Sequence, residues 1–190
     1  MNLRHLMLRL VATFCVIAYS LTARGLLVED LYQAQVLVVD QSEAALQAGV
    51  ASGLQQVLIR VSGNVEVARH GSVIMAMRNP DRFYDEHHYT TTDRQLIVDG
   101  ELNDAKLLTI RFEPNAVSRL LREAGFPVWG SERPGIMVWI AEAEDNGQRR
   151  MLEEGDAGEV AKAFKIRSRE RGLPLLWPLM DLEDTGQVST

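Results

Sequence analysis

The sequence predicts an α+β fold: a small antiparallel-sheet domain with packed helices, followed by the beginning, β-α-β, of a second α/β domain that looks truncated. Apolar residues recur at helical spacing between residues 46 and 61. Two segments with strand patterns, residues 90–98 and 106–112, enclose turn-forming residues. Beyond residue 130, two continuously apolar segments flank another helical segment. We divide the chain into a signal peptide (1–23), an α+β domain (24–130) and a partial α/β domain (131–190).

The N-terminal segment has the order of a secretory signal. Arg4, His5 and Arg9 form a basic start, and residues 10–23 contain neither an acid nor a base. This apolar run is shorter than the roughly 20 residues that a membrane-spanning helix needs. We expect cleavage after Ser20, with Ala23 as a second candidate, and export to the periplasm. An uncleaved anchor in the inner membrane is the alternative.

Charge and cysteine content exclude several classes of function. The formal net charge is −6, and it becomes −8 without the signal because Arg4 and Arg9 are lost. An acidic chain without a basic cluster is unsuited to nucleic acid or to an anionic membrane surface. The only cysteine, Cys15, lies in the signal, so the mature chain has no disulfide, thiolate metal site or cysteine nucleophile.

A strand and a long helix open the α+β domain. Residues 32–39 alternate and then become continuously apolar, which predicts a strand buried at its far end. Asp40 and Ser42 are helix-capping residues, and Gly63 is a typical helix stop. Small residues four apart along the helix would let another element approach closely. They are Ala45, Gly49 and Gly53.

The remainder of this domain contains a hairpin and a second helix. A short apolar segment, residues 72–77, precedes a short helix that we expect to begin at Pro80 with Asn79 as its cap. The hairpin strands at 90–98 and 106–112 have turn chemistry at Asp99-Gly100 and Asn103-Asp104 between them. A final helix is predicted from an Asn115 cap to Gly125.

The second domain begins after a break at residues 133–135. Residues 136–141 form an apolar strand, a helix runs up to Gly172, and residues 173–180 form a second apolar strand. Two such strands around one helix form a β-α-β unit, which requires a parallel sheet covered on both faces. Two strands alone cannot bury such a sheet, so we expect this domain to be cut short.

Many segments in order carry a family resemblance. They are residues 31–36, 56–64, 110–112, 120–125, 127–130, 133–134 with the Trp139 strand, 171–176 and 178–184. Together they resemble an uncharacterised family of bacterial envelope proteins filed as domain of unknown function 2066. The resemblance implies no assigned reaction and no catalytic motif. It also implies that members continue past residue 184 and vary at residues 100–105.

Three carboxylates are the metal-site candidates. Asp181, Glu183 and Asp184 follow the last predicted strand, at the edge where open α/β sheets place ligands. Their hard oxygens could hold Mg²⁺ or Ca²⁺. The structural alternative is a solvated strand exit before a helix N-terminus, where acids are favoured.

Other candidate groups have structural alternatives that we favour. Asp85-Glu86-His87-His88 could ligate a metal, but adjacent histidines diverge, and a solvent-exposed loop explains them. Ser62 lacks a nucleophile elbow and fits helix termination with Gly63. Arg60, on an apolar helix, pairs with a buried carboxylate or backbone carbonyls, or extends to solvent. Three tryptophans could line a glycan or peptide groove or fill the core: Trp129, Trp139 and Trp177.

These observations predict a non-catalytic binding or scaffold protein of the periplasm. The sequence has no phosphate-cradling loop, dinucleotide fingerprint or paired catalytic carboxylates. We therefore expect no catalytic residue and no cofactor, an envelope protein as partner, and no nucleic acid. Binding could use a sheet edge or the junction at residues 130–134. The alternative is a divalent-metal-dependent hydrolase of envelope material that uses Asp181, Glu183 and Asp184.

Overall fold

A computed structural model describes residues 25–98, 100–143 and 149–178. The predicted signal peptide lies outside the described residues. The α+β class is confirmed. The elements, in chain order, are β1 (Leu26–Leu27), β2 (Gln33–Val38), α2 (Glu43–Ser62), the 3-10 helix η1 (Val65–Arg69), α3 (Gly71–Arg78), the 3-10 helix η2 (Pro80–Phe83), β3 (Tyr84–Val98), β4 (Glu101–Phe112), α4 (Pro114–Glu123), β5 (Glu132–Arg133), β6 (Ile136–Met137), β7 (Ala141–Ala143), β8 (Arg149–Met151), α5 (Glu159–Arg171) and β9 (Leu175–Leu176).

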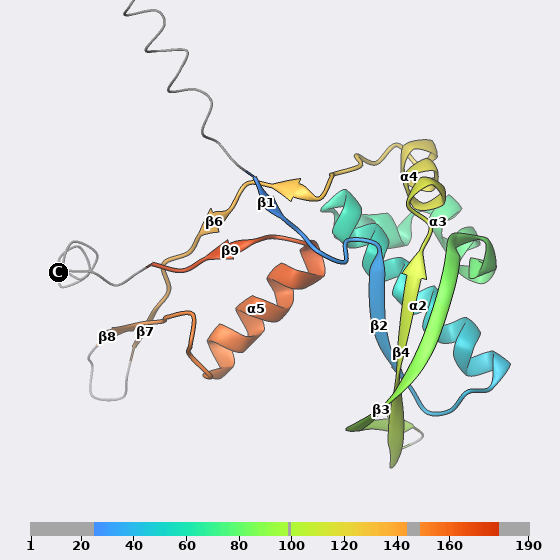
Figure 1. Cartoon of the computed structure of the whole chain (residues 1–190), viewed down its shortest axis with the longest axis horizontal. Coiled ribbons are helices and arrows are strands. Elements are labelled where there is room, and N and C mark those ends of the chain that lie inside the picture. Colours follow the sequence, from blue (N-terminus) through green and yellow to red (C-terminus); the bar gives the residue numbers. More distant parts are fainter. Residues whose placement is uncertain (1–24, 99, 144–148, 179–190) are drawn as a thin grey trace, which may run out of the picture.

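We describe residues 25–130 as the first region and residues 131–178 as the second. A three-stranded antiparallel sheet with helices packed beside it forms the centre of the first region, as Figure 1 shows. The strand order is β2-β4-β3, so β4 is central and each of its neighbours is an edge strand. Leu108 of β4 lies opposite Val36 on one side and Tyr89 on the other. Alternate β4 residues, Leu108, Ile110 and Phe112, are fully buried, which fixes the face that α2 covers.

Helix α2 lies close to this sheet because two of its glycines face the strands. A Cβ atom added at Gly49 would lie 2.6 Å from a methyl carbon of Leu108. One added at Gly53 would lie 2.9 Å from Ile110 Cδ1 and 3.2 Å from the Cβ atom of Ala34. The close approach predicted from the small-residue stripe is therefore confirmed.

The ends of the helices follow local capping chemistry. Ser42 caps α2 by accepting a hydrogen bond from the backbone N–H of Ala45, and Gly63 ends the helix with a φ of 69°. The cap of α4 differs from the prediction. Glu113, instead of Asn115, accepts from the N–H groups of Asn115 and Ala116, because Pro114 takes the first helical position and the cap therefore lies two residues earlier.

The β3–β4 hairpin is longer than the sequence predicts. β3 includes residues 84–89 and β4 includes residues 101–105, so Asn103-Asp104 pairs with β3 instead of forming a turn. Gly100, with a φ of 85°, lies in the connection. Polar residues obscured these strand ends in the sequence. An edge strand with an open face needs few apolar residues, since its backbone partners come from one neighbour and its polar side chains remain in water.

The short elements between α2 and β3 are helical. The apolar segment at 72–77 belongs to α3, and the predicted helix at Pro80 is one turn of 3-10 helix, η2. The Asn79 side chain makes no capping hydrogen bond to it. The expected short helix is therefore a single 3-10 turn, because β3 begins at Tyr84 directly after it.

The second region contains the predicted β-α-β unit in reduced form. β6 and β9 pair in parallel, with Ile136 opposite Leu175, and α5 lies between them in the chain. The predicted strands at 136–141 and 173–180 are too long. Pro174 and Pro178 flank β9, and because proline has no N–H the ladder cannot extend past them. The chain forms a separate antiparallel hairpin, β7–β8, before α5.

The buried apolar core of the described residues lies between Leu31 and Leu121. It joins one face of the sheet to α2, α3 and α4. Within the described part of the chain, no helix combines the length and apolar content that crossing a bilayer requires.

Candidate functional site

The candidate site is a cleft of about 690 Å³ between the two regions. We call it the junction cleft. Two parts of its wall come from the first region: residues 27–30, at the end of β1 and after it, and Arg60 in the last turn of α2. The others come from the second region: α5, the loop before it, and residues 172–175 and 177 around β9. Segments far apart in the sequence therefore meet here, and Figure 1 shows β1, β9 and α5 to one side of the three-stranded sheet.

A buried arginine, Arg133, holds this junction together. Its side chain is 0% exposed. Nε donates to the carbonyl of Gly130, and Nη1 donates to the carbonyls of Arg171 and Gly172 at 2.8 and 2.7 Å. Nη2 donates to Arg60 and Trp129 carbonyls at 2.9 and 3.2 Å. A guanidinium has five N–H donors, so every donor of Arg133 is used.

The bonds of Arg133 connect three separate elements. Its partners are the end of α2, the segment before β5 and the end of α5. The guanidinium also lies 4.3 Å from the centre of the Trp129 ring, a cation–π contact. Burial, and then the nearby charge of Arg60, lower the pKa of Arg133. This residue is a structural clamp and has no donor left for a ligand.

Arg60 differs from Arg133 in how its donors are used. Its Nη1 donates to the backbone carbonyls of Asp30, at 3.0 Å, and Gln33, at 2.7 Å. Its Nε is buried without a hydrogen-bond partner, and its Nη2 has no partner within the described part of the chain. Of the predicted alternatives for Arg60, pairing with backbone carbonyls is confirmed. Burial lowers its pKa, and the charge of Asp30 partly opposes this effect.

A turn at Asp30 positions one of the acceptors for Arg60. Asp30 has a φ of 52°, the only positive φ of a non-glycine residue in the described chain. Aspartate tolerates this left-handed conformation better than most residues. The turn directs the Asp30 carbonyl to both the Arg60 guanidinium and the backbone N–H of Gln33. This part of the cleft wall, the turn at Asp30, thus has a left-handed conformation that only a few residue types adopt readily.

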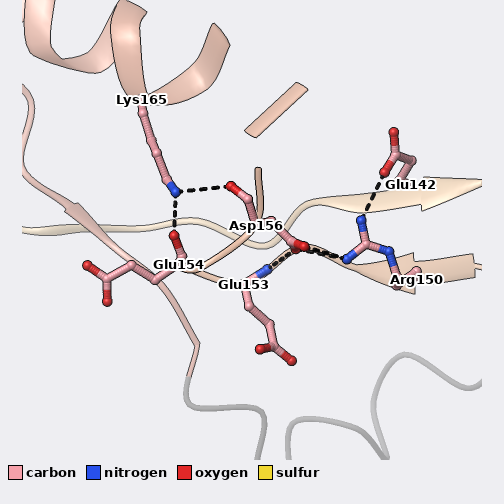
Figure 2. A network of polar contacts seen from close by, with 6 residues as sticks. All are labelled: Glu142, Arg150, Glu153, Glu154, Asp156 and Lys165. Atoms are coloured by element: carbon pink, nitrogen blue, oxygen red, sulfur yellow. Dashed lines mark hydrogen bonds and ion pairs between the residues drawn. The ribbon is translucent and has the colours of Figure 1, made fainter. Parts of the chain in front are cut away.

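The opposite wall is held by a polar network, drawn in Figure 2. Lys165 of α5 donates to the backbone carbonyls of Glu154 and Asp156, and Arg150 lies between Asp156 and Glu142. Asp156 accepts the backbone N–H of Glu153 at 2.7 Å. That bond, followed by Arg150, lowers the pKa of Asp156. The network fixes the loop between β8 and α5 and so fixes the position of Lys165.

The cleft also has an aromatic and a cationic wall. Trp177 is half-buried and its ring centre lies 5.5 Å from Lys165 Nζ. Arg169 of α5 lines the cleft and forms no ion pair within the described residues. Three acids also line it, Glu29, Asp30 and Glu154, and all three are exposed. The arrangement combines cationic donors, a flat ring and a solvated acidic rim.

The described lining of the cleft carries one side-chain hydroxyl. It belongs to Ser168, whose Oγ donates to the carbonyl of Lys165. No histidine is among the described residues that line the cleft, so this hydroxyl has no imidazole base beside it. What the described lining offers a ligand is hydrogen-bond donors and an aromatic face.

The predicted metal ligands are not brought together by the described structure. Asp181, Glu183 and Asp184 lie outside the described residues. Among the described residues, no group of three or more histidine, cysteine, aspartate or glutamate side chains could hold a metal. The predicted loop at Asp85-Glu86-His87-His88 is wrong, because these residues lie in β3. His87 contacts the rings of Tyr84 and Tyr89, whereas His88 is exposed.

The other predicted candidates are dispersed. Ser62 and Gly63 end α2 as predicted, and the Ser62 hydroxyl accepts from the backbone N–H of Asn64. The three tryptophans do not form one groove. Trp177 lines the cleft, Trp129 stacks on Arg133, and Trp139 is 47% exposed. The core interpretation is also incomplete, since none of them is among the buried core residues.

Sequence reasoning missed Arg133, Lys165 and Arg169. Arg133 lies within the predicted junction at residues 130–134, but a lone arginine beside proline and glycine is typical of a surface turn. Arg169 and Lys165 belong to a helix in which charged residues are frequent. No local pattern distinguishes these side chains from solvated ones: Arg133 and Lys165 bond backbone carbonyls, which any residue type supplies, and Arg169 is placed at the cleft only by the fold.

A comparison with family models identifies one match. The model described as "Domain of unknown function (DUF8605)" matches residues 26–130, which is more than half of the chain. The resemblance to domain of unknown function 2066 is therefore wrong. Short segments such as residues 120–125 and 127–130 combine common helix and turn patterns that are not specific to one family. No curated protein or solved structure matches the chain.

Proposed function

The chain belongs to the family of the domain of unknown function DUF8605, and we propose that it is a non-catalytic binding protein of the bacterial cell envelope that takes a small ligand into the junction cleft. The observation that carries this proposal is the arrangement at Arg60. A partly buried guanidinium with unused donors lines a cleft of about 690 Å³, a volume within the usual range of ligand pockets, roughly 300–1,000 Å³.

A binding role is supported by what the cleft offers. A few polar groups that converge on a partly apolar cavity are typical of ligand sites. Arg133 and the Lys165 network hold the walls in place, so the cavity is preformed and a ligand loses little free energy in ordering it. The proposed metal-dependent hydrolase uses Asp181, Glu183 and Asp184, and no observation on the described residues favours it.

The tryptophans provide a matched pair for the test. We would express the full chain with a C-terminal tag in bacteria, purify it without denaturation and measure bound small molecules by native mass spectrometry. We expect a bound mass in the wild type that Trp177→Ala loses and Trp139→Ala retains, because only Trp177 lines the cleft. A wild type without a bound mass, or equal retention by both variants, would contradict the proposal.

The envelope location rests on the N-terminal pattern of Arg4, His5 and Arg9 before the apolar residues 10–23. It is tested by the mass of the N-terminus of protein taken from the periplasmic fraction. We expect a chain that begins at Leu21, with Arg24 as the start if Ala23 is the cleavage residue. An intact Met1 in the membrane fraction would indicate the anchored form. Crosslinking in the same cells would identify an envelope protein partner.

A further inference from the structure

The chemistry of the ligand can be inferred from the unused edge of Arg60, an inference that rests on the proposed binding function. Nη1 is occupied by the carbonyls of Asp30 and Gln33. The atoms without partners, Nε and Nη2, form the side-on edge of the guanidinium. This edge presents two parallel N–H groups, a geometry that matches the two oxygens of a carboxylate or phosphate.

Arg60 also lacks a counter-ion. No carboxylate of the described residues lies within ion-pair distance of its guanidinium, and the fully buried guanidinium of Arg133 lies close enough to bond the Arg60 carbonyl. A half-buried and a fully buried positive charge therefore share the junction, and the described residues offer both of them only backbone carbonyls as hydrogen-bond acceptors. Burial of a charge without a partner is unfavourable. An anion at this edge would supply both the missing charge and the missing acceptor.

The acids of the cleft do not satisfy this requirement. Glu29, Asp30 and Glu154 are exposed, so water solvates them and screens their charge. The lysine of the cleft has little left to offer, because Lys165 uses two of its three N–H donors on the carbonyls of Glu154 and Asp156. Arg169 is the remaining cation, and it forms no ion pair in the part of the chain that the structure describes.

The apolar part of the cleft adds a second requirement. Trp177, Leu173, Pro174 and Leu175 line it. The Trp177 ring presents a flat apolar surface, and aromatic or planar groups stack on such a face. A ligand that fills the cleft thus carries both an anionic group and an apolar, planar part.

We propose that the junction cleft binds a small organic anion, in which a carboxylate or phosphate group bonds the Nε–Nη2 edge of Arg60 and contacts Arg169 while a planar apolar part lies against Trp177. Because Nε is shielded from solvent, binding includes a small rotation of the guanidinium towards the cavity. The carboxylate and phosphate sources share the same recognition chemistry, and the experiment distinguishes them.

The test uses four probes of similar shape with the full chain: benzoate, phenyl phosphate, benzylamine and benzyl alcohol. Affinity is measured by isothermal titration calorimetry, and the Nε–Hε signal of Arg60 is followed by ¹H–¹⁵N NMR. We expect one or both anions to bind at least about tenfold more tightly than the amine and the alcohol, since a charge-assisted hydrogen bond contributes about 1.5 kcal/mol or more. The Arg60 signal should move only with the anions.

Two arginines of α5 supply the matched control. Both are exposed, but Arg169 lines the cleft and Arg167 pairs with Glu170 outside it. Arg169→Ser should weaken anion binding about five- to tenfold, and Arg167→Ser should leave it unchanged. Arg60→Lys keeps a positive charge but lacks the two-donor edge, so it should also weaken binding.

The outcomes separate this inference from the proposed function. Tighter binding of benzoate indicates a carboxylate ligand, and tighter binding of phenyl phosphate indicates a phosphate ligand; both support the inference. Equal or tighter binding of benzylamine, equal effects of the two α5 variants, or no anion binding at all would overturn it. In those cases a bound mass that Trp177→Ala removes would still support a binding protein with a different ligand.

Discussion

The two regions of this molecule are stabilised in different ways. Between Leu31 and Leu121, apolar side chains from the sheet and three helices form one core. In residues 131–178, only three apolar residues of the described chain are buried: Val138, Leu152 and Ala161. Phe164 and Ile166 of α5 are instead 43% and 56% exposed. The first region is thus held by apolar burial. The second is attached to it through Arg133 and the β1–β5 strand pair, and the Arg150–Asp156 network stabilises it internally.

This difference in how the two regions are stabilised explains where the cleft lies. A continuous apolar core packs too tightly to leave space for a ligand. A junction held by hydrogen bonds at a few points leaves gaps between those points, and the junction cleft is one of them. The buried arginines therefore stabilise the junction and also line or support the site.

The largest effect is expected from removal of the clamp. Arg133→Met would leave the carbonyls of Arg60, Arg171 and Gly172 without their donor. Each unsatisfied buried acceptor costs about 1–3 kcal/mol, so we expect the free energy of opening of the second region to fall by about 3 kcal/mol or more. Hydrogen exchange followed by mass spectrometry should show faster exchange in residues 159–178 than in α2.

Arg111→Met is the control for this substitution, because Arg111 is exposed and bonds only Glu86 at 3.5 Å. It should leave exchange in both regions unchanged. Equal acceleration of α2 and α5 by Arg133→Met would mean that the molecule opens as one unit and that the contrast between the regions is wrong.

Two fully buried leucines allow a direct comparison of the regions. Leu54 lies in the first core and Leu152 follows β8, and each is 0% exposed. Leu54→Ala should lower the free energy of global unfolding by about 3 kcal/mol, because it leaves a cavity in a tightly packed core. Leu152→Ala should lower only the local stability of the second region.

Urea unfolding monitored by circular dichroism would measure the global effect, and hydrogen exchange would measure the local one. A Leu152→Ala variant that lowers the urea midpoint as much as Leu54→Ala does would show that the second region contributes to the same cooperative unit.

A smaller effect is expected at the contact between α2 and the sheet. Gly53→Val would place methyl groups against Ile110, Ala34 and Phe112, where even a Cβ atom is too close. We expect a loss of about 1–3 kcal/mol of global stability from overpacking. Gly71→Ala in α3, where an added Cβ meets nothing within 4 Å, should be neutral or slightly stabilising. Thermal unfolding of both variants tests this, and a neutral Gly53→Val would refute the close approach.

The smallest effect concerns acid pH. Bonds from Glu153 N–H and then Arg150 lower the pKa of Asp156 in the folded protein below its ordinary value. The stabilisation is therefore complete above the unfolded pKa, about 4, and is lost as the pH falls through the lower folded value. Hydrogen exchange of residues 149–171 between pH 5 and pH 2.5 should accelerate more steeply in the wild type than in Asp156→Asn.

Glu154→Gln is the neighbouring control, since Lys165 bonds the backbone carbonyl of Glu154 instead of its carboxylate. It should retain the pH dependence of the wild type. If Asp156→Asn also retains it, the carboxylate does not hold the loop before α5.

Local sequence patterns were sufficient for the elements whose signals are local. The 3.6-residue spacing, the Ser42 cap and Gly63 determine α2, and the glycines at 49 and 53 indicate the close contact with the sheet. The alternation at residues 108–112 determines which side of β4 is buried. The extended ends of β3 and β4 could not be found in this way, because they carry polar residues and each of these ends pairs with a single neighbouring strand.

Only the tertiary structure determined the candidate site. Arg133, Lys165 and Arg169 are ordinary charged residues in the sequence, and Arg60 is the one for which carbonyl pairing was among the predicted alternatives. The carbonyls that bond Arg60 and Arg133 come from distant segments that only the fold brings together. A helix cap or an apolar stripe acts between residues a few positions apart, so the sequence alone determines it. The partner of a buried charge is chosen by the fold, since any backbone carbonyl can accept its hydrogen bond and no residue type encodes which one will.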